Sequence, residues 1–209
     1  MNKSEARGYL KELGGETAIT KLEHLAKLLA EANSSQNLIS KSTVEAMWVR
    51  HFADSAQLLE YVPRETVGSQ WIDLGSGAGL PGLIIAILRP DLGVTLVESR
   101  KRRVEWLDKA VRGLRLSNCS VIGQRLENVE TSPFDFISAR AFAPLPKLLH
   151  LASRFSTSET VWLLPKGRSA TQEVQDLPKR LQDMFHVEQS LTDKTAGIVV
   201  GHGQVDVCQ

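Results

Sequence analysis

The sequence predicts an α/β fold: a mostly parallel, Rossmann-like sheet with helices on both faces and a helical extension at its N-terminus. From residue 70 onward, short apolar segments alternate with segments of helical periodicity. A glycine-rich turn joins the first apolar segment to a helix that begins at Pro81. Because parallel strands are joined by right-handed crossovers, this alternation gives a sheet that is covered on both faces.

The chain before the sheet, residues 1–66, forms the expected extension. Residues 1–15 are polar and contain glycine, so we expect them to be frayed. Apolar residues recur at helical spacing over 16–33, and a second helical pattern covers 44–62. Two helices of this length do not make a domain, so we expect them to pack against one compact domain of residues 67–209.

The expected elements of that domain follow the alternation in chain order. Strands are expected over residues 71–74, 94–98, 120–123, 134–138 and 160–164. Helices are expected over residues 81–88, 100–116, 145–155 and 169–183. Segments 185–191 and 198–200 come last, and we expect them to close the sheet as an antiparallel pair.

The composition indicates a globular cytoplasmic protein, and we expect it to be a monomer. Of 209 residues, 42% are hydrophobic and 23% are charged, and no apolar run approaches the ~20 residues of a membrane span. The residues after Met1 contain no apolar segment that could act as a secretory signal, so we expect none. Cys119 and Cys208 have neither CxxC spacing nor a nearby histidine, so neither a disulfide framework nor a metal site is expected. A net charge of +1 neither demands nor excludes a nucleic-acid partner.

The loop after the first strand fits two cofactor templates. Residues 77–82 match GxGxxG, the dinucleotide fingerprint, which is a weak signal when it stands alone. Residues 73–79 match the acidic-x-Gly-x-Gly-x-Gly pattern of S-adenosylmethionine-dependent methyltransferases. A plain tight turn between strand and helix is the third possibility, because glycine suits such turns.

Two features favour the methyl-donor template and S-adenosylmethionine as the cofactor. The carboxylate of Asp73 would repel a pyrophosphate at the following helix N-terminus, whereas it suits a ligand with an ammonium and a sulfonium. Pro81 stands where a dinucleotide loop offers a backbone N–H, and proline has none. Glu98, at the end of the next strand, serves either cofactor, because a carboxylate can accept hydrogen bonds from both ribose hydroxyls.

Over residues 20–167 the sequence resembles the bacterial RsmG (GidB) family of methyltransferases. The resemblance rests on residues 73–82 with Leu88-Arg89-Pro90, on 37–40 with 50–55, on 124–127, and on 138–145. The Gly-Leu-Pro-Gly ending of the loop and the Ser-x-Arg-Ala segment at 138–141 are far more specific than a generic methyltransferase loop. The fold implied is that of a class I methyltransferase.

The resemblance implies methyl transfer to N7 of a guanine in 16S ribosomal RNA, whether free or in the small subunit. Guanine N7 carries no proton, so no general base is expected, and catalysis rests on positioning and electrostatics. With the loop template, the resemblance gives the expected cofactor-binding set: Asp73, Gly75, Gly77, Gly79, Leu80, Glu98, Leu126, Glu127 and Arg140.

Arg140 is the expected catalytic residue. It follows an apolar strand at the carboxyl end, where ligands bind in such sheets. It would pair with the cofactor carboxylate, or donate to guanine O6 at a cost, since positive charge develops at N7. The alternative is a surface salt bridge.

The strongest basic cluster is Arg100, Lys101, Arg102 and Arg103, at the start of a helix, where the macrodipole disfavours cations. Phosphate contacts would explain that cost, and a solvated surface is the alternative. The rest of the expected RNA-binding set is Arg50, His51 and Lys166. His51 also fits the edge of a hydrophobic core.

Three other functions remain open on the sequence. One is a methyltransferase of the same fold that acts on another RNA or on a small molecule. The second is a nicotinamide-dependent Rossmann protein, and the third is an RNA-binding or assembly protein without turnover.

Overall fold

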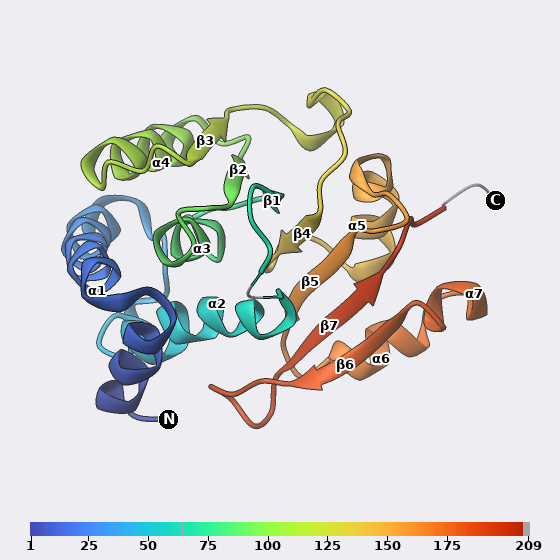
Figure 1. Ribbon diagram of the computed structural model, residues 1–209, viewed down its shortest axis with the longest axis horizontal. Helices are drawn as coiled ribbons and strands as arrows, with labels where there is room; N and C mark the ends of the chain where they lie inside the picture. Colours follow the sequence, from blue (N-terminus) through green and yellow to red (C-terminus); the bar gives the residue numbers. More distant parts are fainter. Residues whose placement is uncertain (64, 207–209) are drawn as a thin grey trace.

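A computed structural model describes residues 1–63 and 65–206, so Cys208 lies outside the described residues. A seven-stranded sheet in the order β3-β2-β1-β4-β5-β7-β6 crosses the molecule (Figure 1). Five strands are parallel, and the last two are antiparallel, as expected. The strands are β1 Gln70–Leu74, β2 Gly93–Val97, β3 Cys119–Ile122, β4 Phe136–Ala139, β5 Val161–Lys166, β6 Phe185–Gln189 and β7 Gly197–His202.

The first helix is longer than the sequence predicted. We expected residues 1–15 to be frayed, but α1 spans Lys3–Gln36, with one non-helical residue at Gly15. Asn2 and Glu5 form a capping box at its start, which satisfies two backbone N–H groups that would otherwise be exposed. Leu10 is fully buried, so this first stretch adds to the core instead of fraying.

The second helical segment is irregular. We expected one helix over 44–62, whereas the structure has a short 3-10 turn η1 (Lys41–Thr43), a π-helical turn η2 (Trp48–Ala53), α2 (Asp54–Ala56) and a 3-10 turn η3 (Gln57–Tyr61). The π-helical turn holds one more residue per turn than expected, and both Trp48 and Phe52 still reach the core. Periodicity alone does not reveal such an insertion.

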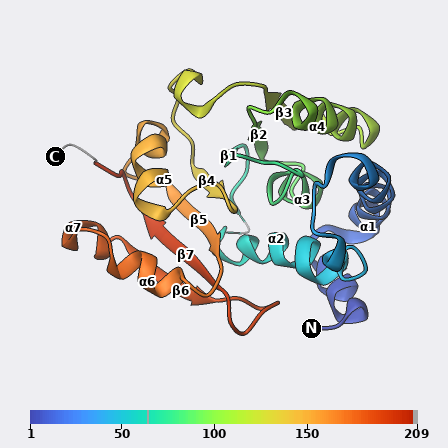
Figure 2. The ribbon, with the colours of Figure 1, turned by 180° about the vertical axis from the view of Figure 1, so that it is seen from behind.

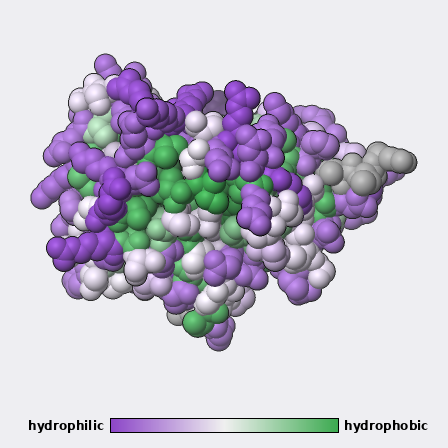
Figure 3. All heavy atoms as spheres, turned by 90° about the horizontal axis from the view of Figure 1, so that it is seen from above, coloured by the Kyte–Doolittle hydropathy of each residue, from purple (hydrophilic) through white to green (hydrophobic). Residues whose placement is uncertain are grey.

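Helices cover both faces of the sheet (Figures 1 and 2). On one face, the helices α1, α3 (Gly82–Leu88) and α4 (Lys101–Gly113) share a core with the side chains of β1 and β2 that point toward them. On the other face, α5 (Leu145–Ala152), α6 (Ala170–Gln175) and α7 (Lys179–Gln182) share a second core with β4, β5 and β7. Seen from above, hydrophilic residues surround a band of hydrophobic ones (Figure 3).

Two further differences concern helix ends. The helix expected over 145–155 ends as the 3-10 turn η5 (Ser153–Phe155), and the one expected over 169–183 is split into α6 and α7. Pro178 causes the split, because it has no backbone N–H for an interior helical hydrogen bond. Within the described residues, no helix has the length and apolar character of a membrane span.

Candidate active site

Three cavities open where the carboxyl ends of β1, β2, β4 and β5 meet. The Glu98 cavity, about 200 Å³, lies beyond β2 and is lined by Glu98, Leu126 and Phe142 among others. The Gly77 cavity, about 260 Å³, lies beyond β1, between Gly77 and Arg140. The Lys166 cavity, about 790 Å³, lies beyond β4 and β5. The chain reverses its strand order between β1 and β4, and open α/β sheets bind ligands at such a switch point.

The turn after β1 brings backbone close to both smaller cavities. Gly75 has a φ of +67°, a conformation that L side chains rarely adopt. A Cβ there would overlap the ring of Phe142, which lies against the glycine. Gly75 lines the Glu98 and Gly77 cavities, so the turn and Phe142 together shape the space between them.

Asp73 does not face the cavities. Its side chain is fully buried, with one carboxyl oxygen accepting from the Ser138 hydroxyl (2.8 Å) and the other from the backbone N–H of Gly82 (3.2 Å). Burial raises the pKa of Asp73 to about 6, although these hydrogen bonds oppose the shift. We expected this carboxylate to meet the cofactor directly; in this position it instead ties the start of α3 to β1 and β4.

Glu98 follows β2 and is also buried, but it lines a cavity. Its carboxylate accepts from three backbone N–H groups, those of Gly77 (3.1 Å), Ser99 (2.8 Å) and Arg100 (2.9 Å). The Arg103 guanidinium lies 3.7 Å away. A carboxylate has about four lone-pair positions, so these bonds leave room for one ribose hydroxyl rather than the two we expected.

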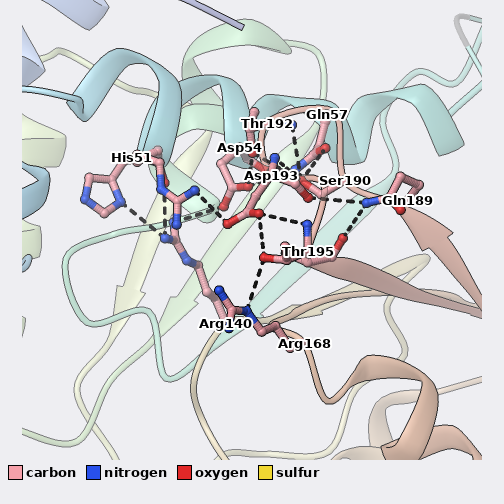
Figure 4. Close-up of polar contacts among 12 residues, drawn as sticks. His51, Asp54, Gln57, Arg140, Arg168, Gln189, Ser190, Thr192, Asp193 and Thr195 are labelled. Carbon is pink, nitrogen blue, oxygen red and sulfur yellow. Dashed lines mark hydrogen bonds and ion pairs between the residues drawn. The ribbon is translucent and has the colours of Figure 1, made fainter.

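Arg140 lies at the boundary between the Gly77 and Lys166 cavities and lines both. Its Nη2 donates to the Arg50 carbonyl and to Nδ1 of His51, both at 3.2 Å. Its Nη1 lies 3.6 Å from a carboxyl oxygen of Asp54 and, within the described residues, is buried without a hydrogen-bond partner. Figure 4 shows His51 and Asp54 pointing toward this guanidinium. Arg140 is therefore part of an interior network and differs from the surface salt bridge considered above.

His51 is neutral in this network. Burial, with the charges of Arg140 and Arg50, lowers the pKa of His51 to about 4. Its Nδ1 accepts from Arg140, so its Nε2 carries the proton and donates to the Thr43 hydroxyl at 2.8 Å. A neutral side chain that is 6% exposed does not supply the positive charge we expected it to offer RNA phosphates.

Of the remaining residues expected to bind the cofactor, some line the cavities and others do not. Gly77 and Leu80 line the Gly77 cavity, and Leu126 lines the Glu98 cavity. Gly79 lines none of the three, because it packs against Leu83 at the start of α3. Glu127 is exposed on η4 (Leu126–Asn128) and also lies outside their linings.

The expected RNA-binding residues lie in two places. Arg100 and Arg103 line the Glu98 cavity, Lys101 is exposed, and Arg102 donates to the Ser35 carbonyl at the end of α1. Arg50 and Lys166 line the Lys166 cavity, where each is already paired: Arg50 with Asp193 (2.7 Å) and Lys166 with Glu173 (2.8 Å).

Sequence reasoning missed Asp54 and the loop between β6 and β7. Asp54 accepts from Gln57 and Thr192, and Gln57 in turn bonds Ser190 and Leu191. Asp54 stands three residues after His51, so helical spacing put both on one face and was a usable signal. The loop lies more than 130 residues from Gln57 in the sequence, and no local sequence pattern predicts their contact.

The fold and the glycine turn place the chain in the Rossmann-like methyltransferase class. A putative methyltransferase, yhhF, from Escherichia coli superposes with a TM-score of 0.57 at 16% identity, covering 73% of this chain and 87% of that one. A mutant of MtNAS in complex with S-adenosylmethionine superposes with a TM-score of 0.54 at 18% identity, over 96% and 77%.

Sequence relatives narrow the class to one family. The family model described as GidB, rRNA small subunit methyltransferase G, matches residues 18–198. Ribosomal RNA small subunit methyltransferase G of Erythrobacter litoralis is 52% identical over 200 residues, which is 96% of each chain. The chain belongs to the rRNA small subunit methyltransferase G family, as the sequence resemblance indicated.

The buried Asp73 predicts a pH dependence of stability. Its pKa is about 6 in the folded chain against 3.8 ordinarily, so between these values the folded chain keeps a proton that the unfolded chain has released. The free energy of unfolding should therefore fall as pH rises from about 4 to 6, by roughly 3 kcal/mol, and then stay level.

Asp73→Asn provides the comparison. Its amide oxygen can accept from Gly82 and its amide nitrogen can donate to Ser138, so both links remain while the titration disappears. Urea unfolding of both proteins between pH 4 and 7 measures the difference. A difference that stays constant with pH would show that Asp73 does not titrate in this way.

Proposed function

We propose that this protein transfers a methyl group from S-adenosylmethionine to N7 of a specific guanine in 16S ribosomal RNA. The observation that carries the proposal is the family match over residues 18–198, which includes every residue of the glycine turn and of the Arg140 network. The two small cavities on either side of Gly75 and the larger one beside Arg140 supply space for a donor and for a base.

The residues around Gly75 fit S-adenosylmethionine. Glu98 offers one lone pair to a ribose hydroxyl, and Leu126 offers an apolar wall for an adenine. Arg103 and Arg140 place two cations beside the Gly77 cavity, where a carboxylate end is stabilised. The structure of MtNAS that superposes on this chain was solved with the same cofactor. When bound, this cofactor supplies a methyl group on a positively charged sulfur.

The chain's own residues have a positioning role in the transfer. Guanine N7 presents a lone pair without a proton, so the reaction needs alignment and exclusion of water but no base. Phe142 lies between the Glu98 and Lys166 cavities and lines both, so its ring can cover the donor on one side and contact a base on the other. Arg140 lines both the Gly77 cavity, which we assign to the donor, and the Lys166 cavity, which we assign to the base. It is the proposed catalytic residue.

A dinucleotide fits this turn poorly. Pyrophosphate binding uses free N–H groups at the helix N-terminus, and here Pro81 has none while the Gly82 N–H is bonded to Asp73. The nicotinamide alternative therefore rests on the GxGxxG match of residues 77–82 alone. A ribosomal substrate is consistent with the cytoplasmic location expected from the sequence, and a monomeric state stays a prediction.

Cofactor binding and methylation test the proposal together. By calorimetry, the protein should bind S-adenosylhomocysteine and not NADH. Gly75→Ala should weaken that binding at least tenfold, because its Cβ meets Phe142 at a positive φ. Gly8→Ala is the matched control, since nothing lies within 4 Å of the added Cβ. N7-methylguanine is then mapped in 16S RNA from cells with and without the gene, and identical maps would refute the proposal.

For RNA contact we propose the exposed start of α4, with Lys101 as the residue least committed to other contacts. Lys101→Gln should lower the salt dependence of RNA affinity by one phosphate contact, a slope change of about 0.7 to 0.9. Lys179→Gln on α7, at the far end of the molecule in Figure 1, should leave the slope unchanged. Equal slopes for both variants would remove Lys101 from the interface.

A further inference from the structure

In the wall of the Lys166 cavity, the donor Nη1 of Arg140 and the acceptor Oδ2 of Asp54 form an ion pair at 3.6 Å, but neither atom makes a hydrogen bond among the described residues. Nη1 of Arg140 is buried and lacks a hydrogen-bond partner among the described residues. The oxygen Oδ2 of Asp54 lies 3.6 Å from it, which is beyond hydrogen-bond distance, and no hydrogen bond to this oxygen occurs in residues 1–63 and 65–206. Both residues line the cavity.

The other carboxylates of this cavity are already occupied. Asp193 accepts from Thr195 on one oxygen and from Arg50 on the other. Glu173 accepts from Lys166 and the Leu145 N–H on one oxygen and from Ser169 on the other. Among the described residues that line this cavity, Asp54 is thus the carboxylate with an oxygen that is ion-paired but accepts no hydrogen bond.

The free oxygen of Asp54 is held in place by its neighbours. The second oxygen, Oδ1, accepts from Gln57 Nε2 at 3.0 Å and from the Thr192 hydroxyl. Gln57 cannot turn its amide over, because its own oxygen accepts from the Leu191 N–H at 2.7 Å. Oδ1 therefore stays on the interior side, and Oδ2 stays beside Arg140.

We propose that Asp54 and Arg140 together recognise the target base as guanine. Arg140 Nη1 donates to O6, and Asp54 Oδ2 accepts from the neighbouring N1–H. This rests on the proposed function and assigns a specificity role to Asp54. Adenine has an amino group in place of O6 and an unprotonated N1, so it offers the opposite hydrogen-bond pattern. Its amino group would meet the donor of Arg140, and its N1 would meet the acceptor of Asp54.

The same pair accounts for the electrostatic cost of placing Arg140 near the reacting base. Methylation at N7 leaves a positive charge on the ring, which a guanidinium at O6 alone would oppose. A carboxylate at N1–H offsets that charge from the same edge of the ring. Because Gln57 and Thr192 fix Asp54 beforehand, the carboxylate needs no rearrangement as charge develops.

The test uses Asp54→Asn in the full chain. Gln57 and Thr192 hold the amide oxygen at the Oδ1 position, so the amide nitrogen replaces Oδ2 and presents a donor to N1–H. The substrates are small subunits reconstituted with 16S RNA that carries guanine or adenine at the target position. Asp176→Asn, at an exposed residue that directly follows α6 and is not part of the cavity lining, is the matched control.

We expect Asp54→Asn to lower kcat/KM on the guanine substrate roughly 10- to 100-fold. The adenine substrate should fall no further, so discrimination between the bases narrows, and the affinity for S-adenosylhomocysteine should stay native. Unchanged guanine methylation, an equal fall on both substrates, or a parallel loss of cofactor affinity would each overturn the assignment. If the native protein neither binds the cofactor nor methylates the RNA, the proposed function fails and this inference fails with it.

Discussion

The buried carboxyl of Asp73 is the constraint on which the site depends. It joins the tip of β1 to Ser138 on β4 and to the first N–H of α3, so three elements meet at one side chain. Ser138 in turn accepts from the Trp71 indole, which extends the link back into the core of β1. The glycine turn lies between these anchor points, and its path past Gly75 follows from where they hold it.

The Arg140 network joins parts of the chain that are far apart in sequence. Arg140 follows β4, His51 and Asp54 come from the N-terminal extension, and Thr192 comes from the loop between β6 and β7 (Figure 4). The extension and the final hairpin thereby form two walls around one guanidinium. The extension also lines the Gly77 cavity through Leu38, Ile39 and His51, and it supplies the carboxylate of Asp54 that we assign to base recognition.

The sequence predicted the sheet, its closing hairpin and the glycine turn after β1, because strand alternation and the glycine pattern are local signals; the location of the donor site stays a prediction. The prediction that residues 1–15 are frayed was wrong, because a capping box and the burial of Leu10 outweigh their polar composition. The roles of Asp73 and His51 also differ from expectation. Residue type predicts a charge, whereas full burial and neighbouring cations decide whether the side chain carries that charge and what it can touch.

The affinity of Asp73→Ala for S-adenosylhomocysteine, measured by calorimetry beside that of Asp73→Asn, tests most directly whether Asp73 anchors the turn. Alanine leaves the Gly82 N–H and the Ser138 hydroxyl unpaired, so the turn loses its anchor, whereas asparagine keeps both links. We predict a loss of at least about tenfold for the alanine variant and near-native affinity for the asparagine variant. Native affinity in Asp73→Ala would contradict the account.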